Sequence, residues 1–372
     1  MALDPAKLEA AGLYDPDAPN AAGRLALLEW IGEHGITIEE MRAAVAERGS
    51  LTGLVGDRVV RPGARLTVAE AAQRSGNTVD EIQRIVQASG SPPVPDGVGA
   101  FTEADVDSFF VFRVAAEMFG WPATLQFTRV MGASLARIAE AAVSLFQVNV
   151  ESRLVDASAG ELALAQANLD ATRGLDGVSL VLDSLFRQQV EHAIERSRVA
   201  RGGESLGTAR FAVGFVDLVG FTPLSLELDA PGLAALVEDF EARAADVVVA
   251  HRGRVVKLIG DEIMFAAVDA ATACEIALAL VDEFRDTDGV TPRGGLGYGV
   301  VVTRGGDYYG PVVNVAARVA QLAVPDEILV TADVARAAGP SFCFEPAGRR
   351  MLKGFDGPVQ LFVVERVPAT RR

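Results

Sequence analysis

Two aspartates in the C-terminal half stand where an isolated negative charge would be costly. Asp217 lies in the middle of the apolar run Gly214–Val219, which predicts a buried strand. A carboxylate buried there without a partner loses its hydration, which costs several kcal/mol. Asp261 follows Gly260 between two further apolar runs, the pattern of a hairpin turn. A helix cap, an ion pair or a turn explains either aspartate alone, but two carboxylates at neighbouring strand ends can also hold a pair of divalent cations.

The residues around these aspartates suit a phosphate ligand. Lys257 stands in an otherwise apolar run, where a turn signal does not explain it. Gly220 permits close approach of the backbone to a ligand, and Thr222-Pro223 opens a helix with proline in its first turn. Because the N–H groups at a helix start are free, they form a site for an oligophosphate.

A third polar feature is the pair Asn314 and Arg318. The two residues are four positions apart, so a helix places them on one face. The residues between them, Val315–Ala317, are apolar, which predicts a largely buried helix whose polar pair faces something specific. By itself such a pair is weak evidence of a functional site.

Strand-like and helix-like runs alternate after Gly207, which predicts an α/β or α+β domain. The predicted strands are residues 210–216, 254–259, 263–267, 294–303, 327–331 and 359–364. The predicted helices are residues 224–250, 270–286 and 310–322. This change of texture places a domain boundary near residue 205, after a glycine-rich linker at Arg201–Gly203.

The N-terminal half is predicted to be entirely helical. Apolar residues recur at helical spacing, with a break at His34-Gly35 and with helix starts marked by capping residues at Thr67 and Thr102. One or two long helices are expected between residues 122 and 173, and another over about residues 175–200. We therefore expect an all-α N-terminal domain at residues 1–174, a helical linker at 175–206 and an α+β domain at 207–372.

Composition limits the partners of the chain. Its 372 residues carry a formal net charge of −16, which repels nucleic acid and anionic membranes. Cys274 and Cys343 are too few for a disulfide framework or a structural zinc site. The N-terminus does not have the pattern of a signal peptide, and no apolar run is long enough to span a membrane. These features predict a cytoplasmic protein with no membrane span and no nucleic-acid partner.

Residues 66–86 have the rhythm of a helix-turn-helix motif, and Phe101–Asp105 resembles its continuation in MerR-type regulators. A recognition helix presents polar side chains to base edges and cations to phosphates. Here the second helix carries Asp80 and Glu81 against Arg84 alone. We interpret the motif as a helical packing module, with a nucleotide-controlled DNA-binding regulator as the alternative.

Four stretches of the C-terminal half together resemble the catalytic domain of class III nucleotide cyclases. They are FVDLVGFT (215–222), KLIGD (257–261), DYYGPVVNVAAR (307–318) and LKGFDGPVQLF (352–362). The resemblance covers about residues 207–366 and implies a class III adenylyl cyclase with a ferredoxin-like βαββαβ core. The implied reaction is attack of the ribose 3′-hydroxyl of ATP on the α-phosphorus, which gives cyclic AMP and pyrophosphate.

The resemblance also implies a role for each motif residue. Asp217 and Asp261 would bind two divalent cations, Mg²⁺ or Mn²⁺. Lys257 and Asp307 would read the adenine base, because guanylyl cyclases of this family place Glu and Cys or similar residues there. The other implied contacts with ATP are Asn314 at the ribose, Arg318 at the transition state, Lys353 and Arg293 at the β- and γ-phosphates, and Gly220, Phe221 and Thr222 in the phosphate loop.

The resemblance extends to assembly and regulation. In this family the site lies between two catalytic domains, so a chain with one such domain implies a homodimer with two symmetric sites. The helical half resembles the N-terminal domain that inhibits some soluble bacterial cyclases at neutral pH. His192, beside Glu191 and Glu195, is a candidate pH-responsive residue of the linker helix, or else an ordinary exposed one. A small apolar ligand of the N-terminal domain is a further expectation, and a catalytically silent nucleotide-binding module is the main alternative.

Overall fold

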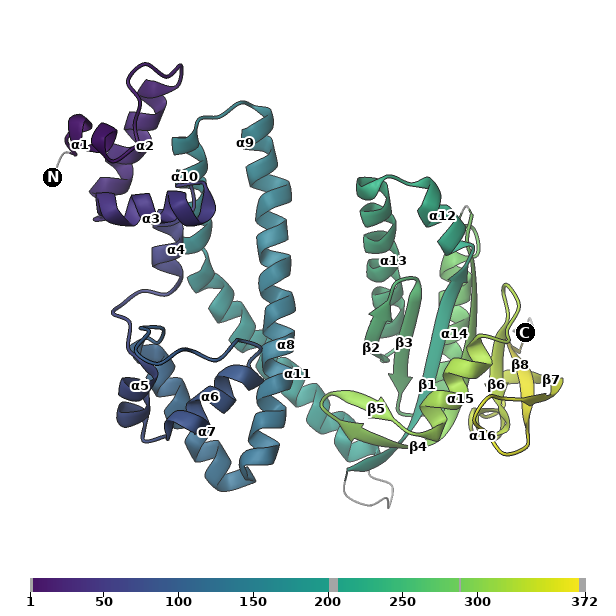
Figure 1. Cartoon of the computed structure of the whole chain (residues 1–372). Coiled ribbons are helices and arrows are strands. Elements are labelled where there is room, and N and C mark those ends of the chain that lie inside the picture. The colour runs from purple at the N-terminus through teal and green to yellow at the C-terminus, as the bar shows by residue number, and fades with distance from the viewer. Residues whose placement is uncertain (1–2, 201–206, 288, 368–372) are drawn as a thin grey trace. The chain divides into compact units, whose positions relative to one another are not determined.

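The computed structural model describes residues 3–200, 207–287 and 289–367 (Figure 1). They form two compact units, Met1–Arg187 and Gln188–Arg372, each with its own hydrophobic core. The predicted linker Arg201–Gly203 and the predicted boundary near residue 205 lie outside the described residues. In the part of the chain that is described, no helix is both long enough and apolar enough to cross a bilayer.

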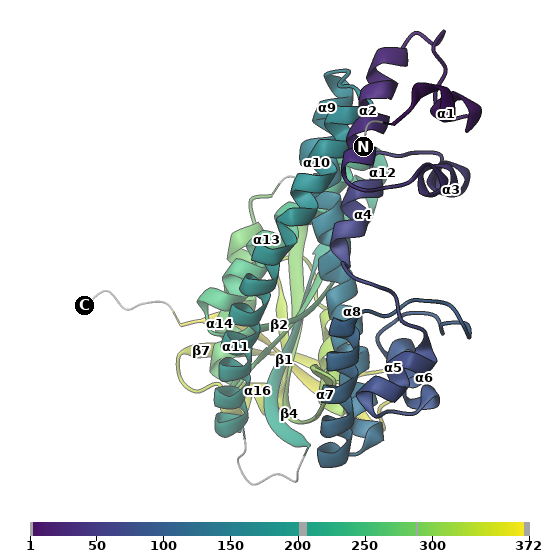
Figure 2. The same cartoon turned by 90° about the vertical axis from the view of Figure 1, so that its left-hand side faces the viewer.

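The described part of the N-terminal unit is helical, as predicted, and contains two clusters of buried side chains. The first cluster joins α1 (Pro5–Ala10), α2 (Ala21–Glu33), α3 (Ile38–Arg48), α4 (Leu54–Val60) and α10 (Glu161–Arg173). In it, α10 packs along α2 and α4 (Figure 2). The second joins α5 (Val68–Ser75), α6 (Val79–Ala88), α7 (Glu103–Phe119) and the start of α8 (Trp121–Phe146). A π-helical turn (Gln147–Glu151) and α9 (Ser152–Asp156) continue α8, and α11 (Leu175–Ala200) follows α10.

Local sequence signals account for where these helices begin. Thr67 accepts the N–H of Glu70 while the Glu70 carboxylate accepts the N–H of Thr67, which closes the capping box of α5. Thr102 and Asp105 form the same arrangement at α7. α2 ends at Glu33, so the predicted break at His34-Gly35 is confirmed.

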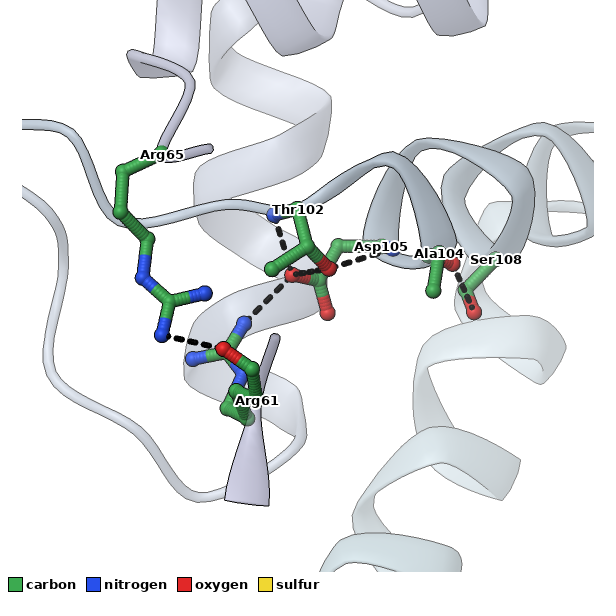
Figure 3. Close-up of polar contacts among 6 residues, drawn as sticks. All are labelled: Arg61, Arg65, Thr102, Ala104, Asp105 and Ser108. Atoms are coloured by element: carbon green, nitrogen blue, oxygen red, sulfur yellow. Dashed lines mark hydrogen bonds and ion pairs between the residues drawn. The ribbon is translucent and has the colours of Figure 1, made fainter. Parts of the chain in front are cut away.

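Asp105 also ties α7 to the segment after α4 (Figure 3). Its Oδ2 accepts the N–H of Thr102 at 2.7 Å and forms an ion pair with Arg61, whose carbonyl accepts from Arg65 at 2.7 Å. Burial raises the pKa of Asp105, but hydrogen bonds from Thr102 and the charge of Arg61 outweigh it and hold that pKa below its usual range. A lowered carboxyl pKa stabilises the fold above the unfolded pKa, and this stability is lost only as the pH falls toward the folded pKa. The contact therefore persists at neutral and mildly acidic pH.

α5 and α6 form the predicted helix-turn-helix arrangement, which is attached to α7. Asn77 in the turn is buried and donates to the carbonyl of Phe109 at 3.0 Å. The cation of α6 is Arg84. Its Nη1 lies 3.9 Å from Oδ2 of Asp80, and the central carbon of its guanidinium lies 6.0 Å from the ring centroid of Trp121. A recognition helix must present its cations to DNA. Arg84 instead makes contacts within the unit, which supports the interpretation as a packing module.

The C-terminal unit is built on a mixed eight-stranded sheet. Its strands are β1 (Thr208–Val219), β2 (Arg254–Ile259), β3 (Glu262–Ala267), β4 (Thr291–Arg304), β5 (Asp307–Tyr309), β6 (Ile328–Thr331), β7 (Phe342–Met351) and β8 (Pro358–Arg366). They lie in the order β2-β3-β1-β4-β6-β8-β7, and β5 pairs with the end of β4. The order β2-β3-β1-β4, with helices after β1 and β3, is a ferredoxin-like core. The predicted fold class, an α+β domain preceded by an all-α domain, is confirmed.

Helices cover both faces of this sheet (Figure 1). α13 (Ala230–Ala250), α14 (Ala270–Phe284) and α16 (Ala332–Ala337) share one core with the sheet, and α15 (Pro311–Ala320) packs on the other face. Alternate residues of β1 serve the two cores, Val216 the first and Phe215 the second, because successive strand residues point to opposite faces.

Glycines in β4 let α15 lie unusually close to the sheet. A Cβ built on Gly295 would lie 2.2 Å from the backbone nitrogen of Ala320 and 2.7 Å from the carbonyl oxygen of Ala316. Neither contact is possible for a real side chain, so only glycine fits here. This close packing fixes the helix that carries Asn314 and Arg318 against the strand that carries Arg293.

The predicted helix 224–250 is wrong in one respect, because it is two helices. α12 (Phe221–Glu227) ends before Asp229, whose side chain accepts the N–H of Gly232 and so begins α13. β5, β7 and α16 were not among the strands and helices predicted from the apolar runs. β5 and α16 are very short, and β7 contains Pro346 and an irregular register before Gly348, so its apolar residues do not alternate regularly.

Candidate active site

Asp217 is neutralised by an arginine from the neighbouring strand. Asp217 on β1 and Arg293 on β4 are direct partners in the antiparallel register. The guanidinium donates from Nε to Oδ1 at 2.9 Å and from Nη2 to Oδ2 at 3.1 Å. Both side chains are mostly shielded, 22% exposed for Asp217 and 27% for Arg293. This two-bond pair compensates the charge of the carboxylate within the strand.

Asp261 lies in the turn between β2 and β3, next to Glu262, which is the register partner of Asp217 on β1. Gly260 adopts φ 63° in the turn, which confirms the predicted hairpin. Burial raises the pKa of Asp261, and the negative charge of Asp217 raises it further. A raised carboxyl pKa means that the ionised form lowers the stability of the fold at neutral pH, so a cation bound here would relieve that cost.

A third carboxylate, Glu262, completes this cluster, and the sequence reasoning missed it. Glu262 begins β3 and is the register partner of Asp217. Its pKa is raised by burial and then by the charges of Asp217 and Asp261. The signal in the sequence was the doublet Asp261-Glu262, which places two acids where a turn meets a strand.

These carboxylates suit a hard divalent cation. Asp217 and Asp261 offer oxygen ligands, which Mg²⁺ and Mn²⁺ prefer, and the register places Glu262, the residue after Asp261, opposite Asp217. The described residues contain no group of three or more side chains arranged to hold a metal by themselves. Mg²⁺ is usually bound by one or two carboxylates together with substrate phosphates, so the residues present fit that mode.

Lys257 and Asp307 form the second polar pair. Lys257 on β2 donates from Nζ to Oδ2 of Asp307 on β5 at 2.8 Å. Asp307 Oδ1 accepts the N–H of Tyr308 at 2.7 Å, and Arg254 donates to the carbonyl of Gly306 and stacks 5.3 Å from the Tyr308 ring centroid. The side chains of Lys257 and Asp307 are 41% and 27% exposed, so a ligand can reach both. The pair offers a donor and an acceptor side by side.

Three other predicted site residues, Asn314, Arg318 and Lys353, lie on the surface. Asn314 and Arg318 share a face of α15 and are exposed, whereas Ala316, Val319 and Ala320 are buried. Arg318 donates to Gln321 at 3.2 Å. Lys353 is exposed between β7 and β8. Among the described residues, none of these three bonds to either polar pair.

The predicted phosphate loop follows β1. Gly220 has φ 97°, and a Cβ there would lie 2.4 Å from the carbonyl oxygen of Gly289, so the close approach requires glycine. Phe221 is buried in the core, which leaves its backbone for a ligand, and Thr222 is exposed. His192, the candidate regulatory residue, is exposed on α11.

Comparisons with known proteins cover both halves of the chain. Residues 206–366 match the adenylate and guanylate cyclase catalytic domain, and residues 7–194 match the adenylate cyclase regulatory domain. The pH-sensitive adenylate cyclase MT1302 of Mycobacterium tuberculosis is 33% identical over 93% of this chain and 88% of its own length. This chain belongs to the class III adenylate cyclase family.

Three further proteins are similar to this chain. An adenylate cyclase of Streptomyces coelicolor is 34% identical over 72% of this chain and 70% of its own. The uncharacterized protein Rv2212 of Mycobacterium tuberculosis is 32% identical over 99% of this cyclase and 96% of its own length. Among solved structures, the adenylyl cyclase CyaB from P. aeruginosa is similar over 44% of this chain and 98% of its own, with 24% identity and a TM-score of 0.41.

Two open depressions lie beside the N-terminal helices of this cyclase. Their volumes are about 420 and 360 Å³, and charged side chains line both, Glu39 and Arg42 in the first and Asp15, Arg24 and Glu161 in the second. Neither is a closed apolar cavity. The small apolar ligand expected for this domain therefore stays a prediction.

Proposed function

We propose that this adenylate cyclase forms cyclic AMP and pyrophosphate from ATP at two sites between the subunits of a homodimer. The observation that carries the proposal is the Lys257–Asp307 pair, an exposed donor and acceptor 2.8 Å apart. Lys257 would donate to N1 of adenine and Asp307 would accept from its 6-amino group. Guanine presents the reverse pattern of donor and acceptor at these two positions, so the pair favours ATP over GTP.

The acidic end of the sheet would hold the cations of the reaction. Asp217 and Asp261 would bind two ions, Mg²⁺ or Mn²⁺, which when bound supply charge stabilisation for the attacking and leaving oxygens. The raised pKa of Asp261, caused by burial and by the charge of Asp217, supports this role. Gly220 and Thr222 would bring backbone N–H groups to the phosphates.

The remaining site residues would act on the sugar and the phosphates. Asn314 would orient the ribose so that its 3′-oxygen is in line with the α-phosphorus, and Arg318 would bind the charge that develops there. Lys353 and Arg293 would hold the β- and γ-phosphates as the bond to the leaving pyrophosphate breaks. Each of these residues thus binds or positions one part of ATP.

A homodimer is proposed because Asn314 and Arg318 of one chain are accessible to a partner chain. Asn314 and Arg318 are exposed in the single chain. Among the described residues, neither bonds to the acidic cluster, which is Asp217, Asp261 and Glu262. In a two-fold dimer, one protomer would supply Asp217 and Asp261, and its partner would supply Lys257, Asp307, Asn314 and Arg318.

The first test is the reaction itself. The purified full chain should form cyclic AMP and pyrophosphate from ATP with Mg²⁺ or Mn²⁺, and at least about tenfold less cyclic GMP from GTP, because unpaired polar groups penalise the wrong base. Binding of ATP without turnover under any of these conditions would favour a silent nucleotide-binding module instead.

The N-terminal unit is proposed to act as a pH-linked brake. The regulatory-domain match and the relative named as pH-sensitive support this role. Acidification adds charge to histidine, and His192 is exposed on α11, the helix that leads toward the catalytic domain. Asp105 is not a suitable sensor, because its lowered pKa keeps it ionised near neutrality.

Removal of residues 1–203 should raise activity at neutral pH by at least about fivefold, a typical size for coupling between domains. It should also flatten the increase in activity that acidification gives in the full chain. Activity measured from pH 5.5 to 8 on both proteins checks this, with His192→Gln in the full chain as a narrower test. Identical pH profiles for the truncated and full chains would rule out a pH-linked brake.

A further inference from the structure

Arg293 occupies the carboxylate oxygens that the proposed function gives to a metal ion. Both oxygens of Asp217 accept from the guanidinium, at 2.9 and 3.1 Å. A third bond from Nη1 to the carbonyl of Ala323, at 3.3 Å, holds another part of the same group. A divalent cation at Asp217 therefore competes with a guanidinium that is held by both the Asp217 carboxylate and the Ala323 carbonyl.

Arg293 is also the cation that interacts with the whole acidic cluster. Its charge acts on Asp217, Asp261 and Glu262 together. The register places Glu262 and Arg293 on the two strands that flank Asp217, so the sheet holds these charges in place. Without the guanidinium, three neighbouring carboxylates would repel one another. Arg293 thus stabilises this end of the sheet when no metal is present.

We propose that Arg293 is a counterion that exchanges partners during substrate binding. It neutralises Asp217 in the metal-free protein and moves to the triphosphate when a cation takes its place. This rests on the proposed function, in which Asp217 binds metal and Arg293 contacts phosphate. Because the guanidinium must leave first, a bare cation binds weakly. The nucleotide offers Arg293 a new anionic partner, so nucleotide and cation strengthen each other's binding by the same factor.

The test measures Mn²⁺ binding to the full chain without nucleotide, by the electron paramagnetic resonance signal of free Mn²⁺. Arg293→Gln should bind Mn²⁺ about tenfold more tightly than the wild type, because the competing charge-assisted bonds are gone. Arg293→Lys should fall between them, since lysine keeps the charge but not the two-bond geometry. If Arg293→Gln does not fold, the Mn²⁺ affinity of Arg293→Lys still tests the proposal.

Arg366 provides the matched control. It lies on β8 and pairs with Glu275 at 2.8 Å and with Asp282, so Arg366→Gln removes the same charge and a comparable ion pair outside the acidic cluster. Its Mn²⁺ affinity should equal that of the wild type. A general effect of net charge would instead tighten binding in both glutamine variants, and that result would overturn the proposal.

A second measurement repeats the titration with saturating 3′-deoxy-ATP, which cannot cyclise. The nucleotide should tighten Mn²⁺ binding in the wild type about tenfold more than in Arg293→Gln, because only the wild type gains from the partner exchange. Unchanged or weaker Mn²⁺ binding by Arg293→Gln, with binding abolished by Asp217→Asn, would overturn the exchange alone. Wild-type binding by Asp217→Asn would overturn the metal assignment and the proposal with it.

Discussion

Replacement of Asp217 by asparagine is expected to lower cyclic AMP formation by about 10³-fold, because one oxygen ligand and one negative charge are lost where the cations must bind. Asp261→Asn should have an effect of similar size. The fold should survive, since Asp217 is partly exposed and its partner Arg293 can still bond an amide oxygen. Turnover with Mg²⁺ and with Mn²⁺ is the measurement, together with circular dichroism.

Asp246→Asn is the matched control for these variants. Asp246 is exposed on α13, so the same chemical change there should leave turnover at the wild-type level. Near-wild-type activity of Asp217→Asn at saturating metal would remove this residue from the metal site.

The second large effect concerns the base. Lys257→Glu combined with Asp307→Cys should lower the preference for ATP over GTP by about 10²-fold. Each mismatched polar group costs about 1–3 kcal/mol when it is left unpaired against the base, and two groups are changed. The measurement is the ratio of kcat/KM for the two nucleotides.

The single variant Lys257→Glu separates base reading from a structural role. It places a second negative charge beside Asp307, so it should weaken binding of both nucleotides. Full ATP preference in the double variant would mean that these two residues do not read the base.

The arrangement of the sheet could be predicted because its central strands are apolar and end at clear turns. The runs around Asp217 and Asp261 predicted β1, β2 and β3, and Gly260 predicted the hairpin between β2 and β3. β7 could not be predicted in this way, because an exposed edge strand with Pro346 and an irregular register carries no regular apolar pattern.

The contacts of the candidate site depend on which strands pair in the sheet. The apolar pattern of the sequence does not give this pairing. Arg293 was expected at a phosphate on the basis of the family resemblance, and its bonds to Asp217 follow only from the β1–β4 register. Lys257 and Asp307 were expected to act together, and their direct ion pair requires the hairpin and the end of β4 to meet. Glu262 was missed because its charge matters only once β3 lies beside β1.

The central claim is that each site combines acids from one subunit with Arg318 from the other, and mixing two inactive proteins tests it most directly. Asp217→Ala and Arg318→Ala should each be inactive alone. After subunit exchange in equal amounts, about half of the dimers should be mixed, each with one intact site, so cyclic AMP formation should recover to about a quarter of the wild-type rate. No recovery, with subunit exchange demonstrated by differently labelled chains, would mean that each site is built within a single chain.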